Sequence, residues 1–267
     1  MNKKFIVSAI AGLGLAASGS ASAIVVGGVD FGAAGETTHI ETSTVAETFV
    51  NAPGQTLLGY GQINTVNGNL FYSNGGLSRL YFVFDYNVLT FDATGATFDQ
   101  GNMNVYMLPT FNLLNQGSVA NLALIQGGTL WATLSGHDMF GGPSELNANG
   151  TLTGGSISFT GSGLLDIVSG PNGVLEFLDS NGIDDGAGGF ADIALTSSGN
   201  NAVLNPFDIA NGDADGCAQG VAAAGEWCIA GSADLRGLTT VPEPGVLALV
   251  GLGLLGMGVS LRKRKAA

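Results

Sequence analysis

The stretch RLYFVFDY, residues 79–86, carries the strongest secondary-structure signal in this chain of 267 residues. Apolar side chains recur in it at every second position, and successive side chains of a strand point to opposite faces of a sheet. The residues that share one face are Leu80, Phe82, Phe84 and Tyr86. This period of two predicts a β-strand with one buried face.

Short apolar runs of the same kind recur through residues 24–240, separated by turn-forming residues. Asn-Gly occurs six times, and this dipeptide suits the positive φ angles of hairpin turns. No apolar period of 3.6 residues is sustained, and the 44 glycines disfavour helices. The pattern predicts an all-β body, a β-sandwich or jelly roll, with residues 179–235 as a long loop region.

The body is strongly acidic. Of the eight Lys and Arg residues, only Arg79 and Arg236 lie in it, and these two against twenty Asp and Glu give a net charge of −18. Such a surface repels phosphate backbones, so nucleic acid is excluded as a partner.

The first 23 residues have the layout of a secretory signal peptide. Lys3 and Lys4 precede a short apolar core, and Ala21-Ser22-Ala23 forms a small-x-small cleavage site for signal peptidase. Export leads to an oxidising compartment, where two cysteines are expected to pair. The predicted disulfide joins the chain's only cysteines, Cys217 and Cys228.

The C-terminal segment, residues 241–267, combines three features in order. Pro242, Glu243 and Pro244 come first, an uncharged apolar span covers residues 245–261, and a basic cluster follows. The basic residues are Arg262, Lys263, Arg264 and Lys265. As a helix the span would be about 25 Å long, slightly short of a hydrocarbon core of about 30 Å. We expect a single transmembrane helix in the inner membrane, with the basic cluster in the cytoplasm.

This order of motif, span and basic cluster resembles the PEP-CTERM sorting signal of exported bacterial proteins. The resemblance implies that an exosortase, an integral-membrane enzyme, recognises the signal and cleaves near the Pro-Glu-Pro motif. It also implies a Gram-negative bacterium, a final location outside the cell or on its surface, and a link to exopolysaccharide and biofilm formation. It covers about 25 of the 267 residues and none of the body.

The body contains no complete catalytic motif, so we expect it not to be an enzyme. Its two histidines are His39 and His137, and the run from Ser135 to Asp138 lacks the sequence context of a catalytic triad. The leading hypothesis is a structural or adhesive component of an exopolysaccharide or biofilm matrix.

Two alternatives to that hypothesis stay open. A carbohydrate-binding module would use exposed aromatic rings, for which Trp131 is a candidate, whereas Trp227, beside Cys228, is expected in the core. A glycoside hydrolase needs only two carboxylates from distant positions, which the sequence does not exclude.

Calcium is the cofactor for which the sequence offers ligands. The stretches DSNGIDDG, residues 179–186, and DIANGDADG, residues 208–216, combine carboxylates with turn glycines, as calcium loops do. Asp213 and Asp215 are the stronger candidates, and Asp179 and Asp184 the weaker ones. Bound calcium would bridge the body to an anionic polysaccharide. The alternative is a pair of solvated Asx turns.

Overall fold

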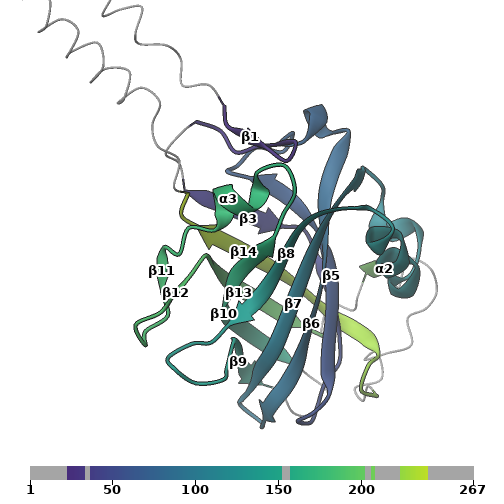
Figure 1. The fold of residues 1–267 in the computed structure, drawn as a ribbon. Coiled ribbons are helices and arrows are strands. Elements are labelled where there is room, and N and C mark those ends of the chain that lie inside the picture. The colour runs from purple at the N-terminus through teal and green to yellow at the C-terminus, as the bar shows by residue number, and fades with distance from the viewer. Residues whose placement is uncertain (1–22, 34–36, 152–156, 202–205, 208–222, 240–267) are drawn as a thin grey trace, which may run out of the picture. The chain divides into compact units, whose positions relative to one another are not determined.

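The computed structural model describes residues 23–33, 37–151, 157–201, 206–207 and 223–239 (Figure 1). The strands and helices lie in one compact unit made of residues 25–31 and 36–240. The strands are β1 (Val25–Val26), β2 (Val29–Asp30), β3 (Thr38–Thr42), β4 (Val45–Thr48), β5 (Thr56–Val66), β6 (Ser78–Phe91), β7 (Gly95–Pro109), β8 (Thr129–His137), β9 (Leu146–Thr151), β10 (Ser158–Ser169), β11 (Ile183–Asp184), β12 (Phe190–Ala191), β13 (Ile193–Asn200) and β14 (Trp227–Gly237). The helices are η1 (Asn74–Gly76), η2 (Leu113–Asn115), α2 (Ser118–Gln126) and α3 (Val174–Leu178).

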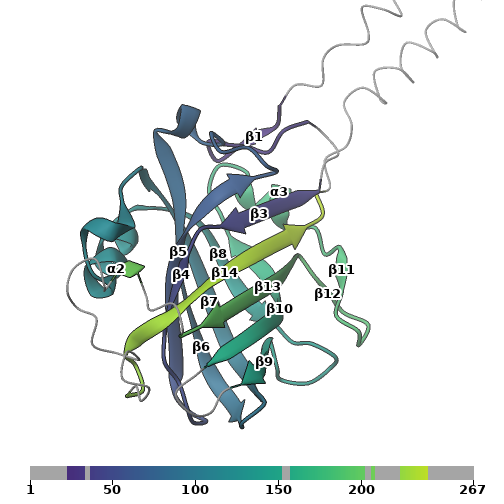
Figure 2. The same cartoon turned by 180° about the vertical axis from the view of Figure 1, so that it is seen from behind.

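Ten of these strands form one antiparallel sheet that closes into a barrel-like ring of eight positions (Figures 1 and 2). The strand order around the ring is β13, β10, β8, β7, β6, β5, β3 and β14, and β14 pairs again with β13. β4 lies between β14 and β5 beyond the end of β3, and β9 lies between β10 and β7 beyond the end of β8. The prediction of a mostly β body is confirmed.

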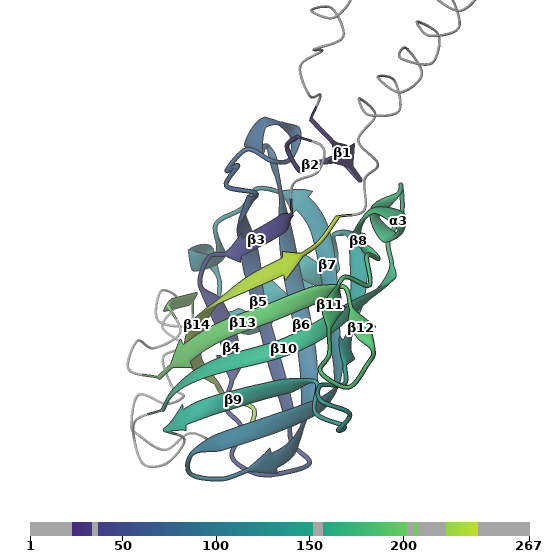
Figure 3. The ribbon, with the colours of Figure 1, turned by 90° about the vertical axis from the view of Figure 1, so that its left-hand side faces the viewer.

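The prediction of a β-sandwich or jelly roll is corrected, because the strands connect into one closed sheet. In Figure 3, β10, β13 and β14 cross in front of β5, β6 and β7, as the two layers of a sandwich would. The two layers are nevertheless one sheet, because eight residue pairs join β13 to β14. A Cβ on Gly231 would lie 2.3 Å from the carbonyl oxygen of Ser198. Glycine therefore allows the close strand approach that closes the ring.

The strand predicted from RLYFVFDY is confirmed as part of β6, and its apolar face is buried. The opposite face is covered as well, which the sequence pattern did not indicate. Tyr81 and Val83 on that face pack in one buried cluster with Ile125. Ile125 belongs to α2, which lies outside the sheet in Figure 1. This helix gives the sheet a second, smaller core on its outer side.

The predicted loop region of residues 179–235 contains much of the two strands that close the ring, β13 and β14. Their Ser, Ala, Thr and Gly residues weaken the hydrophobic pattern, although Ile193, Leu195 and Leu235 are buried in the core.

The expectation that Asn-Gly pairs mark hairpin turns holds for one pair and not for another. Asn67 and Gly68 both have positive φ angles, as a hairpin turn requires, whereas the pair at 149–150 lies within β9.

Several predicted features fall on residues outside the described ranges. These are residues 1–22 of the signal peptide, the sorting signal from residue 241, and Cys217. Cys228 is buried in β14, and its disulfide stays a prediction. Within the described ranges, none of the helices is long and apolar enough to cross a membrane.

Candidate functional site

An open groove lies on the outer face of the closed sheet, beside the hairpin formed by β11 and β12. Its volume is about 590 Å³, which is within the range of small-molecule sites. The ends of β3 and β14, part of β13 and the β11 segment supply its walls. The residues that give it its chemical character are Thr37, His39, Ile183, Asp184, Arg236 and Leu238. We call it the hairpin groove.

The register of the sheet places the chain's two histidines in one row. His39 on β3 pairs with Arg236 on β14, which pairs with Ala194 on β13. The row continues through Leu164 on β10 to His137 on β8. Directly paired residues of neighbouring strands project from the same face. Both histidines therefore lie on the outer face, at the two ends of a row that includes Arg236.

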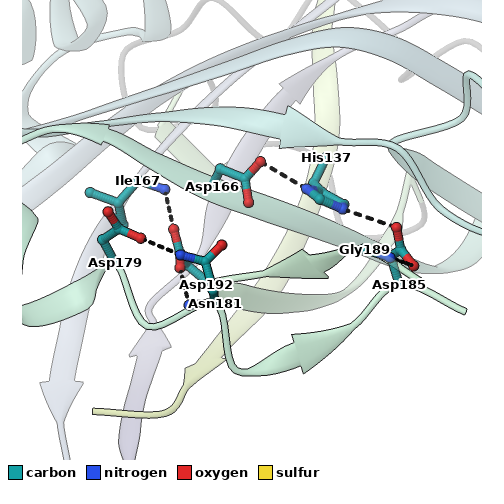
Figure 4. Close-up of polar contacts among 8 residues, drawn as sticks. All are labelled: His137, Asp166, Ile167, Asp179, Asn181, Asp185, Gly189 and Asp192. Carbon is teal, nitrogen blue, oxygen red and sulfur yellow. Dashed lines mark hydrogen bonds and ion pairs between the residues drawn. The ribbon is translucent and has the colours of Figure 1, made fainter. Parts of the chain in front are cut away.

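At one end of this row, His137 lies between two aspartates (Figure 4). Its Nδ1 atom is 2.8 Å from Oδ2 of Asp166 on β10, and its Nε2 atom is 3.4 Å from Oδ2 of Asp185 in the hairpin. Burial lowers the pKa of His137, but the hydrogen bonds and charges of Asp166 and then Asp185 outweigh it and raise the pKa above its ordinary value. Protonated His137 thus links the hairpin to the sheet.

The same contacts limit what His137 can do chemically. Both ring nitrogens are engaged by carboxylates, whereas a general base needs a nitrogen free to reach a substrate proton. The pKa of Asp185 is lowered, first by the backbone N–H of Ala187 and further by His137. Sequence reasoning missed both partners of His137, because Asp166 and Asp185 lie 29 and 48 residues away from it.

A buried aspartate anchors the base of the hairpin. Asp192 is 2 % exposed. Its Oδ2 accepts a hydrogen bond from the backbone N–H of Ile167, and its Oδ1 accepts one from the backbone N–H of Asn181 (Figure 4). This carboxylate joins β10 to the segment before β11. It therefore fixes one wall of the hairpin groove.

The weaker calcium candidates each have a local partner. Asp179 accepts a hydrogen bond from Nδ2 of Asn181, and Oδ1 of Asp184 accepts one from the backbone N–H of Gly186, both at 2.7 Å. The contact of Asp184 is an Asx turn, the alternative that the sequence left open. Asp213 and Asp215 lie outside the described residues, so calcium there stays a prediction.

A different group can hold a metal ion in the described part of the chain. His39, Glu41 and Asp234 each offer one ligand atom, and these three atoms lie within 4.8 Å of one another. His39 and Glu41 alternate on β3, and Asp234 on β14 pairs with Glu41. An imidazole with two carboxylates suits a transition metal better than calcium, which prefers oxygen ligands. The sequence did not indicate this group, because the β3–β14 pairing creates it.

The expectation that Trp131 faces outward as a sugar platform is wrong. Trp131 is 4 % exposed, and its indole N–H donates to the carbonyl oxygen of Gly27 at 3.1 Å. The β7–β8 register shifts beside it, so Trp131 and Ala132 are both buried despite the alternation. Trp227 is half-buried, with its ring 5.3 Å from that of Tyr60, as expected for a core residue.

A family model described as the PEP-CTERM protein-sorting motif matches residues 240–265. The match includes the Pro-Glu-Pro motif and the basic cluster, all of which lie outside the described residues. The chain is therefore a PEP-CTERM protein, an exported protein that an exosortase sorts to the cell surface or the extracellular space. No curated protein and no solved structure matches the chain.

Proposed function

We propose that the exported body is a non-enzymatic structural or adhesive component of an exopolysaccharide or biofilm matrix, and that it holds polysaccharide in the hairpin groove. The sorting motif supports a location outside the cell. The proposed route is that of a Gram-negative bacterium: signal peptidase acts at the N-terminus, the C-terminal span enters the inner membrane, and exosortase releases the body.

The observation that carries the proposal is the composition of the hairpin groove. Arg236 supplies hydrogen-bond donors, Asp184 supplies an acceptor, and Ile183 and Leu238 supply apolar contact. A sugar ring presents hydroxyl groups at its rim and C–H groups on its faces, so it needs both kinds of surface. The guanidinium of Arg236 also has the fork geometry that binds carboxylates. We therefore infer a polysaccharide that offers a carboxylate to Arg236. Because the body has a net charge of −18, we propose that calcium bridges its carboxylates to the other acidic groups of the polysaccharide.

Two features support binding over catalysis. His137 has both ring nitrogens engaged by aspartates. Among the described residues that line the hairpin groove, Asp184 is the one carboxylate, whereas a glycoside hydrolase places two carboxyl groups on either side of the scissile bond.

The test is co-sedimentation of the full chain with polysaccharide purified from the producing strain. Arg236→Gln should weaken binding by about tenfold, as expected when one partner of a charged hydrogen bond is lost. Arg79→Gln is the matched control, because it removes the body's other arginine, which lies outside the groove lining. We expect this variant to bind like the wild type.

Equal binding by the wild type and Arg236→Gln would show that the hairpin groove is not the polysaccharide site. A deletion strain with unchanged flocculation and biofilm mass would contradict the matrix role itself. Release of reducing sugar from the polysaccharide would favour the hydrolase alternative.

A further inference from the structure

The interior of the closed sheet is incompletely filled at one end. A cavity of about 60 Å³ lies among side chains of β4 to β7 on one side and of β9, β10, β13 and β14 on the other. Its walls are mostly apolar and include six aromatic rings, which belong to Phe82, Phe84, Tyr86, Phe91, Phe98 and Phe159. A second interior cavity, between Ile40 and Trp131, has a volume of about 20 Å³ and a wholly apolar lining.

One carboxyl group faces the larger cavity. Glu47 on β4 is 6 % exposed and alternates with Val45, which lines the same cavity. Its strand neighbours are Gly59 on β5 and Ile229 on β14. The side chain has no hydrogen bond or ion pair with any residue that the structure describes, and desolvation is the one cause that shifts its pKa.

An unpaired carboxyl in this position is energetically unfavourable. Burying a polar group without a compensating hydrogen bond destabilises a fold, and burying an unpaired charge does so more strongly. An eight-stranded closed sheet has room inside for packed side chains or for one small ligand. Around the smaller cavity, of about 20 Å³, side chains nearly fill the interior. At the larger cavity, of about 60 Å³, a carboxyl group faces empty space.

Charge and size restrict what can occupy this space. A carboxylate attracts cations, and aromatic faces attract them as well. A hard metal ion would need several oxygen ligands, and Glu47 is the one carboxylate in the lining. A cavity of 150 Å³ accepts benzene, so a cavity of about 60 Å³ accepts an ion of only a few heavy atoms.

We propose that this interior cavity is a binding site for a small alkylammonium ion. The N–H groups of the ion donate to the carboxylate of Glu47, and its alkyl carbons contact the surrounding phenylalanine rings. Ser197, the one hydroxyl-bearing aliphatic residue in the lining, can accept a further N–H. The site is separate from the hairpin groove, which shares none of its lining residues.

The experiment is an NMR titration of the full chain, in an uncharged detergent, with ethylammonium as the probe. We expect saturable shifts of the methyl groups that line the cavity, with a Kd of the order of 1 mM, near the best that three heavy atoms can provide. Ethanol and acetate are a neutral and an anionic probe of similar size, and neither should bind.

Glu47→Gln keeps the shape of the side chain and should weaken ethylammonium binding by about tenfold or more. Glu176→Gln, at an exposed position in α3, is the matched control and should bind like the wild type. The carboxyl ¹³C signal of Glu47 in the wild type gives a second readout that needs no variant. It should move as ethylammonium is added.

The proposal is overturned if ethylammonium causes no saturable shift at concentrations well above the expected Kd. It is also overturned if Glu47→Gln binds as tightly as the wild type, or if ethanol binds equally well. The first result would leave water as the occupant of the cavity.

Discussion

Replacing Glu47 by glutamine should remove a loss of stability that this buried carboxyl imposes at high pH. Desolvation raises the pKa of Glu47 from its ordinary 4.5 to about 7 in the folded protein. The unfolded chain releases the proton above about pH 4.5, whereas the folded chain holds it until about pH 7. The free energy of unfolding of the wild type therefore falls as the pH rises between these values and is level above them.

The size of this effect follows from the shift itself. Each pKa unit corresponds to about 1.4 kcal/mol, so a rise from 4.5 to about 7 corresponds to about 3 kcal/mol. This is a large part of the 5–15 kcal/mol by which most domains are stable. Glu47→Gln has no proton to release, so its stability should lack this fall.

Urea unfolding of the wild type and of Glu47→Gln, measured below pH 4.5 and above pH 7, provides the assay. Relative to that of the wild type, the free energy of unfolding of Glu47→Gln should be about 3 kcal/mol larger at the higher pH than at the lower pH. Glu176→Gln, at an exposed position, should follow the wild type. If the curves of the wild type and Glu47→Gln run parallel with pH, then Glu47 is not a desolvated carboxyl and the reasoning fails.

Three further predictions concern the hairpin, the core and the chain's processing. His137→Gln should destabilise the fold more below the ordinary histidine pKa of 6.5 than above the raised one, because the raised pKa makes the contribution of His137 present at low pH and lost as the pH rises; equal urea midpoint changes at both pH values would contradict this. Gly59→Ala should destabilise by about 2 kcal/mol through overpacking, since its Cβ would lie 2.0 Å from the ring of Phe84; an unchanged melting temperature would show that the ring moves aside without loss. The exported wild type should end near residues 241–245 by intact mass, and Glu243→Ala should retain the apolar tail; a wild-type mass that includes residues 245–261 would argue against cleavage at the motif.

The sequence predicted the strands better than the way they connect. The period of two in residues 79–86 identified β6 because large aromatic side chains make the pattern unmistakable. In β13 and β14 the outward positions carry mostly small or polar residues, such as Ala194, Thr196, Ser198 and Asp234, so these strands resembled loop. Whether two layers stay separate or join depends on one ladder of hydrogen bonds, which no local pattern encodes. A sandwich and a closed sheet therefore have the same alternation of apolar and polar residues in their sequences.

The site residues were harder to predict, because each cluster combines strands that are distant in the sequence. His137 is joined by Asp166 and Asp185 rather than by its neighbour Asp138. His39 and Glu41 meet Asp234 only through the β3–β14 pairing. The calcium candidates were chosen from local spacing, and for Asp184 the local spacing produced an Asx turn.

Glu47 belongs to a sequence pattern whose meaning depends on the strand pairing. In the run VAET, residues 45–48, a period of two places the carboxyl on the same face as Val45. Four residues are too few to decide which face is inner, and only the pairing of β4 with β14 and β5 turns that face to the interior. An apolar side chain of similar size would fill the space without a buried carboxyl. A carboxyl that lowers stability above its pKa and faces empty volume among aromatic rings is better explained by a cation that pairs with it than by packing.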